Sequence, residues 1–148
     1  MSDGPLPDTE WPPTRPFFEA AARGELAIPR CAGCGAWVWY PRDDCPRCGG
    51  VHLPWTPVSG RGTLFSWAVV RRALWKPFAE KVPYVTGLVA LEEDPAVRVV
   101  TTLVDCEPGD LRVDMPVRAV FRALAFRGAP RQVVVPMFAP VPPTGPAR

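Results

Sequence analysis

The sequence contains little of what most hydrolytic enzymes and nucleic-acid-binding proteins depend on. Its 148 residues include one histidine, His52, which leaves a single candidate for the commonest general base. Charge of one sign is also scarce, because 17 basic residues face 15 acidic ones and the net charge is +2. A balance this even gives no strong electrostatic case for a nucleic acid partner.

Long apolar runs are absent as well. No stretch approaches the roughly 20 apolar residues that a membrane-spanning helix needs, so we expect no membrane partner. The N-terminus, Met1-Ser-Asp-Gly-Pro, lacks the basic and apolar regions of a secretory signal peptide. Five cysteines, four of them in metal spacing, favour a reducing compartment, and we expect the protein in the cytoplasm.

The cysteines are the most informative feature that is present. They form two CxxC pairs, Cys31-Ala-Gly-Cys34 and Cys45-Pro-Arg-Cys48, ten residues apart, and a glycine follows each pair. Each glycine permits a positive φ, so that backbone N–H groups can point back at the sulfurs. Four thiolates arranged in this way make a tetrahedral site. We predict one zinc ion held by Cys31, Cys34, Cys45 and Cys48.

Two disulfides or a redox CxxC motif are the alternative interpretations of these cysteines. The duplication of the motif and the lack of a surrounding βαβ pattern favour zinc. Residues 26–30 and 37–40 predict strands on either side of the first pair. A module this small cannot bury enough surface to fold alone, so the metal is expected to hold it together.

A short helix is expected ahead of this ribbon. Thr14 is placed to cap residues 15–23, with Pro16 in the first turn and Gly24 just past the end. A helix of about ten residues is marginal in water by itself, so we expect it to dock on this chain or on a partner. Residues 1–13 are rich in proline, aspartate and glycine and are expected to lack fixed structure.

From Gly60 onward the sequence changes to strands. Five segments rich in valine, phenylalanine, tryptophan and threonine are separated by turn signals. Five short strands favour a small closed barrel, of which the OB-fold is the commonest version, and a β-sandwich is the alternative. The predicted strands are residues 63–71, 84–91, 97–104, 117–123 and 133–138.

We therefore predict a mainly β protein with two modules. A helix and rubredoxin-like zinc ribbon occupy residues 14–57, and a five-stranded OB barrel occupies residues 58–140. A disordered N-terminus, 1–13, and a flexible tail, 141–148, flank them.

The order of these motifs resembles one family. The stretch Phe17-Phe-Glu-Ala-Ala-Ala-Arg-Gly-Glu-Leu26 leads into the CxxCG and CPxCG knuckles, and Ser59-Gly-Arg-Gly-Thr63 opens the barrel. Phe65-Ser-Trp-Ala-Val69 and Val135-Pro-Met-Phe138 also fit, so that the matching stretches cover roughly residues 14–140. The chain is similar to the DUF35 family, the acyl-CoA-associated proteins that join a zinc ribbon to an OB-fold.

What the resemblance implies is an accessory role. Members of the family pair with thiolase-superfamily proteins, including lipid-transfer-protein-type thiolases and aldolases, and some are fused to hydratase-like domains in steroid side-chain degradation. The partner carries the catalytic residues, and the DUF35 subunit is thought to stabilise it and to help shape its acyl-CoA site. We expect a non-catalytic subunit of a thiolase or retro-aldolase in lipid, steroid or aromatic acyl-CoA metabolism, with acyl-CoA at the shared interface.

Two isolated residues offer little chemistry of their own. His52 follows the second CxxC pair, and a closed Cys₄ site keeps no open position for a catalytic water. Cys106 has no histidine near it in the sequence and is expected to be a small packed residue. We therefore predict no catalytic residues in this chain.

The loop predicted between the first two barrel strands combines cations with aromatic side chains. We expect it, with two phenylalanines of the helix, to contact a protein partner or coenzyme A, although a plain solvated surface is also consistent with it. Cations interleaved with aromatics also bind single-stranded nucleic acid, so an OB-fold nucleic-acid-binding module is the alternative function. The predicted contact residues are Phe17, Phe18, Arg71, Arg72, Trp75, Lys76 and Phe78.

Overall fold

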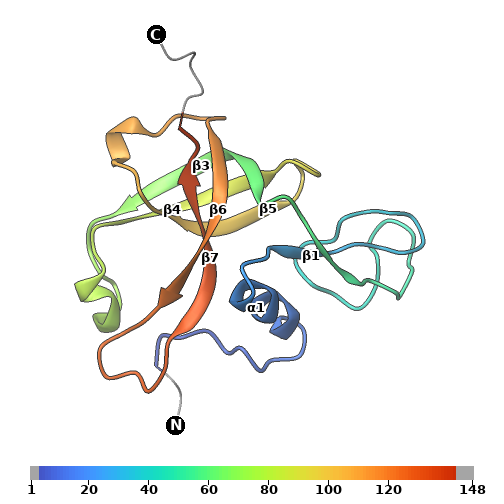
Figure 1. Cartoon of the computed structure of the whole chain (residues 1–148), viewed down its shortest axis with the longest axis horizontal. Coiled ribbons are helices and arrows are strands. Elements are labelled where there is room, and N and C mark those ends of the chain that lie inside the picture. Colours follow the sequence, from blue (N-terminus) through green and yellow to red (C-terminus); the bar gives the residue numbers. More distant parts are fainter. Residues whose placement is uncertain (1–3, 143–148) are drawn as a thin grey trace.

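The structure is a computed structural model that describes residues 4–142. A closed barrel lies beside a small ribbon module, and helix α1 lies between them (Figure 1). The elements are α1 (Arg15–Ala22), β1 (Ala27–Pro29), β2 (Trp55–Pro57), β3 (Arg61–Val70), the 3₁₀ turn η1 (Lys76–Glu80), β4 (Tyr84–Leu91), β5 (Arg98–Leu103), the 3₁₀ turn η2 (Pro108–Asp110), β6 (Pro116–Leu124) and β7 (Val133–Pro140).

The five long strands close into a barrel in the order β3-β4-β5-β7-β6. All neighbours are antiparallel except β5 and β7, which run parallel and close the barrel through Leu103 and Phe138. Alternate side chains point inward, so Leu64, Val89 and Phe138 are completely buried in one core. The predicted five-stranded OB barrel is confirmed, and the β-sandwich alternative is wrong.

The strand boundaries follow the predicted hydrophobic segments closely. Residues 84–91 coincide with β4, and the other four predictions end within two residues of the observed strands. Gly62 explains why β3 begins earlier than predicted, because it pairs with both Leu91 of β4 and Val117 of β6. A Cβ atom at this position would overlap the Ala90 carbonyl oxygen, so the three strands can meet only around a glycine.

Helix α1 begins at Arg15 as predicted, but the predicted side-chain cap is wrong. Thr14 occupies the N-cap position and its side chain makes no capping hydrogen bond. The side-chain oxygen of an N-cap residue accepts a hydrogen bond from the N–H of the second or third helical residue. Pro16 has no such N–H, and the Phe17 N–H donates to the Thr14 carbonyl at 3.0 Å instead. Gly24, with φ +78°, ends the helix as expected.

The helix docks on this chain, between the ribbon and the barrel. Its buried face consists of Ala20 and Ala21, and it packs against β7 and β1. The first ribbon strand continues the core, because Leu26 and Ile28 belong to the same buried cluster as the barrel interior. The Val58 N–H donates to the Leu26 carbonyl at 2.9 Å where the ribbon joins the barrel. The two modules therefore share one apolar interior.

The segment before the helix has packing contacts of its own. It is predicted to lack fixed structure, but residues 6–9 contact the β6–β7 hairpin, beside which this segment runs in Figure 1. Leu6 is buried against Phe126 and Val133, and Arg131 donates to the Pro7 carbonyl at 3.4 Å. Residues 1–3 and 143–148, which include most of the predicted tail, lie outside the described residues. No helix within the described part of the chain is long and apolar enough to cross a membrane.

Candidate metal centre and contact surface

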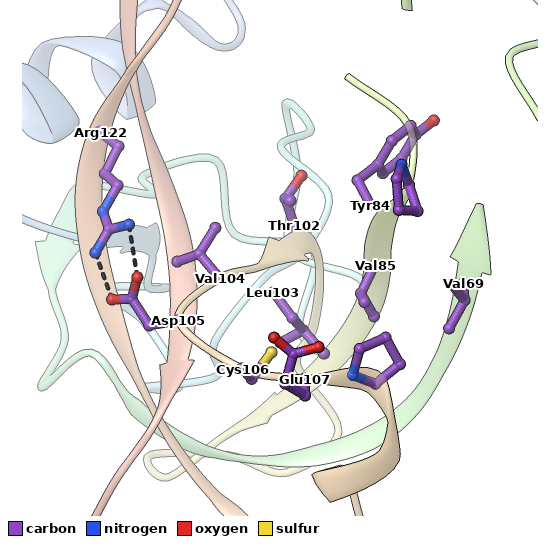
Figure 2. A pocket seen from close by; sticks show the side chains of 12 residues that line it. Val69, Tyr84, Val85, Thr102, Leu103, Val104, Asp105, Cys106, Glu107 and Arg122 are labelled. Atoms are coloured by element: carbon purple, nitrogen blue, oxygen red, sulfur yellow. Dashed lines mark hydrogen bonds and ion pairs between the residues drawn. The ribbon is translucent and has the colours of Figure 1, made fainter. Parts of the chain in front are cut away.

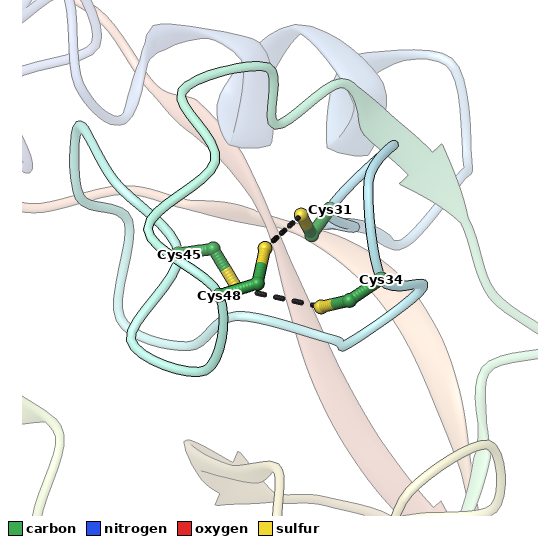
Figure 3. A group of neighbouring side chains, drawn as sticks. All are labelled: Cys31, Cys34, Cys45 and Cys48. Carbon is green, nitrogen blue, oxygen red and sulfur yellow. Dashed lines mark hydrogen bonds between the residues drawn. The ribbon is translucent and has the colours of Figure 1, made fainter.

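The two CxxC pairs meet at one point of the ribbon (Figure 3). The sulfurs of Cys31, Cys34, Cys45 and Cys48 all lie within 4.8 Å of one another. Cys31 and Cys48 are 3.5 Å apart at Sγ, and Cys34 and Cys45 are 3.7 Å apart. Four sulfurs placed about 2.3 Å from a zinc ion are separated by about 3.8 Å in a tetrahedron, so the cluster has the size of a zinc site.

Disulfides do not account for these cysteines. Sulfurs in a disulfide lie about 2.05 Å apart, and the distances here are much longer. All five cysteines of the chain are free. The disulfide alternative is therefore wrong.

The backbone of each knuckle folds toward the sulfurs. Gly35 and Gly49 both have φ +75°, and each donates its N–H to the carbonyl of the first cysteine in its pair at 2.8 Å. In the second pair, the amides of Arg47 and Gly50 each donate to a cysteine sulfur at 3.4 Å. Amides aimed at sulfur stabilise thiolates, which are the form that binds metal.

The thiols of the cluster do not ionise independently. A hydrogen bond from the Cys34 backbone is the main reason that the pKa of the Cys31 thiol falls to about 7, against the effect of its burial. The Gly50 amide lowers the pKa of Cys48, but hydrogen bonds with the Cys31 and Cys34 sulfurs outweigh it and raise that pKa to about 12. Neighbouring thiolates repel one another, so a cation is needed to keep all four deprotonated.

The spacer between the pairs differs from the prediction. The strand expected over residues 37–40 is wrong, because the segment forms one isolated bridge between Trp37 and Arg30. The Val38 N–H still donates to the Pro29 carbonyl at 2.8 Å, and Val38 is buried beside the cysteines. Pairing stops there because the next six residues must return the chain to Cys45. The strand that pairs with β1 is instead β2, after the second knuckle.

The predicted contact residues fall into two groups. Phe17, Phe18 and Phe78 are half-buried and pack inside the protein. Phe18 and Phe78 lie against the same small core around Phe126, while Phe17 contacts the ring of Trp39. Internal packing therefore accounts for these three side chains.

The other four predicted contact residues are exposed on the loop between β3 and β4. Arg71, Arg72, Trp75 and Lys76 all lie at the surface, and 51% of Trp75 is accessible. Their neighbour Leu74, which is not among the predicted contact residues, is 97% exposed. In the sequence, Leu74 is an apolar residue between Arg72 and Lys76 that belongs to no alternating strand pattern, and this could have indicated its exposure.

A cavity of about 440 Å³ opens between the ends of β3, β4 and β5 (Figure 2). Arg122 spans one side of it and donates to Asp105 at 2.9 Å, so its charge is paired. Cys106 lines the cavity half-buried. Burial, reinforced by the charges of Asp105 and Glu107, raises the pKa of its thiol and opposes thiolate formation.

His52 lies in the ribbon, exposed and outside the cysteine cluster. Its backbone carbonyl accepts the Ala32 N–H at 3.0 Å.

Comparison with known proteins identifies the family. The ChsH2 rubredoxin-like zinc ribbon domain matches residues 18–51, and the ChsH2 C-terminal OB-fold domain matches residues 55–122. A DUF35 domain-containing scaffold protein of Methanocaldococcus jannaschii is 35% identical over 100 residues, covering 67% of this chain and 69% of the relative. The chain belongs to the DUF35 family. Its ribbon is the zinc-binding module of that family, and the predicted zinc cofactor is confirmed.

Other relatives of this DUF35 protein belong to acyl-CoA enzymes. A probable enoyl-CoA hydratase alpha subunit of Thermomonospora curvata is 33% identical over 127 residues, covering 86% of this chain and 37% of the relative. The DUF35 chain thus spans little more than a third of that hydratase subunit. In solved structures, a chain of the Ltp2-ChsH2(DUF35) aldolase matches with a TM-score of 0.76 and 30% identity, covering 91% of this chain and 98% of the other.

Proposed function

We propose that this DUF35 protein is a non-catalytic accessory subunit of a thiolase-type acyl-CoA enzyme, a thiolase or retro-aldolase. One observation carries the proposal: the chain corresponds to almost the whole of a chain in the Ltp2-ChsH2(DUF35) aldolase, in fold and in sequence. The names of the curated relatives, a scaffold protein and an enoyl-CoA hydratase subunit, support the same role.

The chemistry of the chain supports a role without catalysis. We propose that Cys31, Cys34, Cys45 and Cys48 hold one zinc ion as a closed Cys₄ site, in which the metal supplies folding energy. A closed site offers no coordination position for a substrate. Burial and the nearby carboxylates raise the pKa of the Cys106 thiol, which disfavours the nucleophilic thiolate. Catalytic groups are accordingly assigned to the partner.

We further propose that the subunit stabilises its partner and helps to shape the acyl-CoA site at the shared interface. The exposed loop residues Arg71, Arg72, Trp75 and Lys76 are the proposed contact residues, because all four lie at the surface and about half of the Trp75 side chain is accessible. Five free thiols support a location in the reducing cytoplasm.

Single-stranded nucleic acid binding ranks second. OB-folds bind oligonucleotides on the outer face of their second and third strands, where bases stack on aromatic rings. Here the outward positions in the middle of β4 and β5 carry aliphatic residues and threonines, which pair as Leu88 with Val100 and Thr86 with Thr102. Tyr84, at the start of β4, packs against Phe78. This face supports base stacking poorly.

The test is co-expression with a thiolase-like protein, chosen from a neighbouring reading frame where one is encoded there. With an affinity tag on the DUF35 chain only, we expect the thiolase-like protein to co-purify and to elute with it as one complex in size-exclusion chromatography. The matched control carries the tag on a Cys45→Ser variant, which should lose the ribbon and retain less partner. A wild-type chain that elutes alone while the partner remains soluble would contradict the proposal.

A further inference from the structure

The loop between β3 and β4 is fixed at one end. Its second half, η1, packs on the β6–β7 hairpin, with the rings of Phe78 and Phe126 5.0 Å apart. The Lys81 ammonium lies 5.0 Å from the centre of the Phe126 ring, and the Arg127 N–H donates to Glu80 at 3.1 Å. Aromatic packing and hydrogen bonds therefore hold the base of this loop against the barrel.

The other half of the loop projects into solvent. This segment, residues 71–76, is here called the basic tip, and Figure 1 shows it beside η1 at the edge of the barrel farthest from the ribbon. Leu74 is 97% exposed, and Trp75, half-exposed, lies 5.8 Å from Phe78 between ring centroids. The fixed base thus presents a leucine and a tryptophan to the outside in a defined position.

The charges of the basic tip are uncompensated. Arg71, Arg72 and Lys76 are all exposed, and the segment contains no acidic residue. Within residues 4–142 none of the three forms an ion pair, whereas six other cations do, among them Arg61 and Arg122. An acidic surface is the complement that this arrangement lacks.

The shape of the basic tip favours a protein over a small molecule. Small ligands bind in concave sites that bury most of their surface. None of five surface cavities, with volumes between about 220 and 550 Å³, is lined by a residue of the basic tip. A protruding leucine and tryptophan flanked by arginines instead have the composition of an interface centre, in which tryptophan and arginine are enriched.

We propose that the basic tip is the element by which this subunit docks onto its catalytic partner. Leu74 and Trp75 enter an apolar depression on the partner, and the three cations meet an acidic rim around it. The inference rests on the proposed function, since it assigns the partner's binding surface within that complex.

The experiment measures the affinity of the full-length, zinc-loaded chain for the thiolase-like subunit used in the co-expression test, at low and high salt. One variant combines Arg71→Glu with Arg72→Glu, and a second combines Leu74→Ala with Trp75→Ala. The matched control combines Arg112→Glu with Val113→Ala, an exposed cation and an exposed valine from the segment before β6. Zinc content and melting temperature establish that each variant is folded, as expected for substitutions at exposed sites.

We expect both tip variants to bind the partner more weakly by on the order of tenfold or more, and the control to bind like the wild type. The wild-type affinity should fall as salt increases, and the charge-reversed variant should lose or invert this dependence. A wild-type chain that binds the partner, with tip variants that bind equally well, overturns the docking assignment and leaves the proposed function intact. A wild-type chain that does not bind overturns both.

A titration with coenzyme A tests whether this small molecule, rather than a protein, occupies the basic tip. The docking proposal predicts that the isolated wild-type chain does not bind coenzyme A through the basic tip. Binding of coenzyme A that disappears in the Arg71→Glu, Arg72→Glu variant, with unchanged affinity for the partner, would make the tip a coenzyme A site and overturn the proposal.

Discussion

The ring of Phe17 lies 5.6 Å from the ring of Trp39, measured between centroids, and this contact joins helix α1 to the zinc ribbon. Trp55 lies 6.5 Å from both rings and completes the cluster from the side of β2. The helix has eight residues, and neither it nor the ribbon is large enough to fold independently. The aromatic cluster therefore couples one side of the helix to the metal-binding ribbon, while the helix also packs on β7 of the barrel.

The first prediction concerns the metal. The purified chain should contain one zinc ion, and replacing any of the four clustered cysteines by serine should unfold the ribbon, because zinc binding there is folding free energy. Elemental analysis and circular dichroism are the measurements, and Cys106→Ser is the control that should keep its zinc. Less than half an equivalent of zinc in the wild-type protein, without iron, would count against the assignment.

The second prediction concerns the aromatic cluster. Phe17→Ala should lower the free energy of unfolding by roughly 2–3 kcal/mol, below the usual cost for a fully buried phenylalanine because this ring is only half-buried. Urea denaturation provides the measurement. Trp75→Ala, which removes an exposed ring, should change stability by about 0.5 kcal/mol or less. Equal costs for the two variants would show that the helix contact does not matter.

The third prediction concerns the crossing point of β3, β4 and β6. A Cβ atom at Gly62 would overlap the Ala90 carbonyl and lie 2.8 Å from Val89 Cγ1, so Gly62→Ala should destabilise the barrel by about 1–3 kcal/mol or more. Gly109→Ala is the matched control, because no heavy atom lies within 4 Å of its added Cβ. Thermal denaturation of both variants decides this. A Gly62→Ala protein as stable as the control would mean that the strands can separate without cost.

The metal site and the barrel could both be predicted from the sequence, because cysteine spacing indicates the first and alternating apolar residues indicate the second. The CxxC pairs specify which sulfurs converge, and alternating apolar residues specify strands such as β4. The pairing of β1 with β2 was not predicted, because β2 is three residues long and contains Pro57. Short strands of this kind carry too few alternating positions to be distinguished from a turn.

The predicted contact residues include three that pack inside the protein, because composition does not reveal which aromatic side chains pack internally. Phe78 and Trp75 are close in the sequence and are both predicted contact residues, yet Phe78 packs on Phe126 while about half of Trp75 is exposed. The partner of Phe78 is distant in the sequence. Only the fold brings it near.

The fourth prediction concerns acid stability. A hydrogen bond from Arg122 holds the pKa of Asp105 below its ordinary value, so this ion pair stabilises the fold above the unfolded-state pKa, about 3.9, and the contribution is lost as the pH falls through the lower folded-state value. Asp105→Asn should therefore be less stable than the wild type at neutral pH, with a difference that shrinks below about pH 4.

Urea midpoints measured across this pH range provide the test, and Arg122→Gln should show the same narrowing because it removes the other half of the pair. A stability difference that stays constant down to the most acidic pH would show that the ion pair does not set the ionisation of Asp105.

Acyl-CoA turnover by the separated and recombined subunits tests the central claim most directly. The DUF35 chain, the thiolase-like partner and their mixture are assayed for carbon–carbon bond cleavage or formation on an acyl-CoA. We predict no turnover by the DUF35 chain alone, reduced or unstable activity of the partner alone, and full activity of the complex. Turnover by the DUF35 chain alone, from a preparation free of any thiolase, would contradict the account.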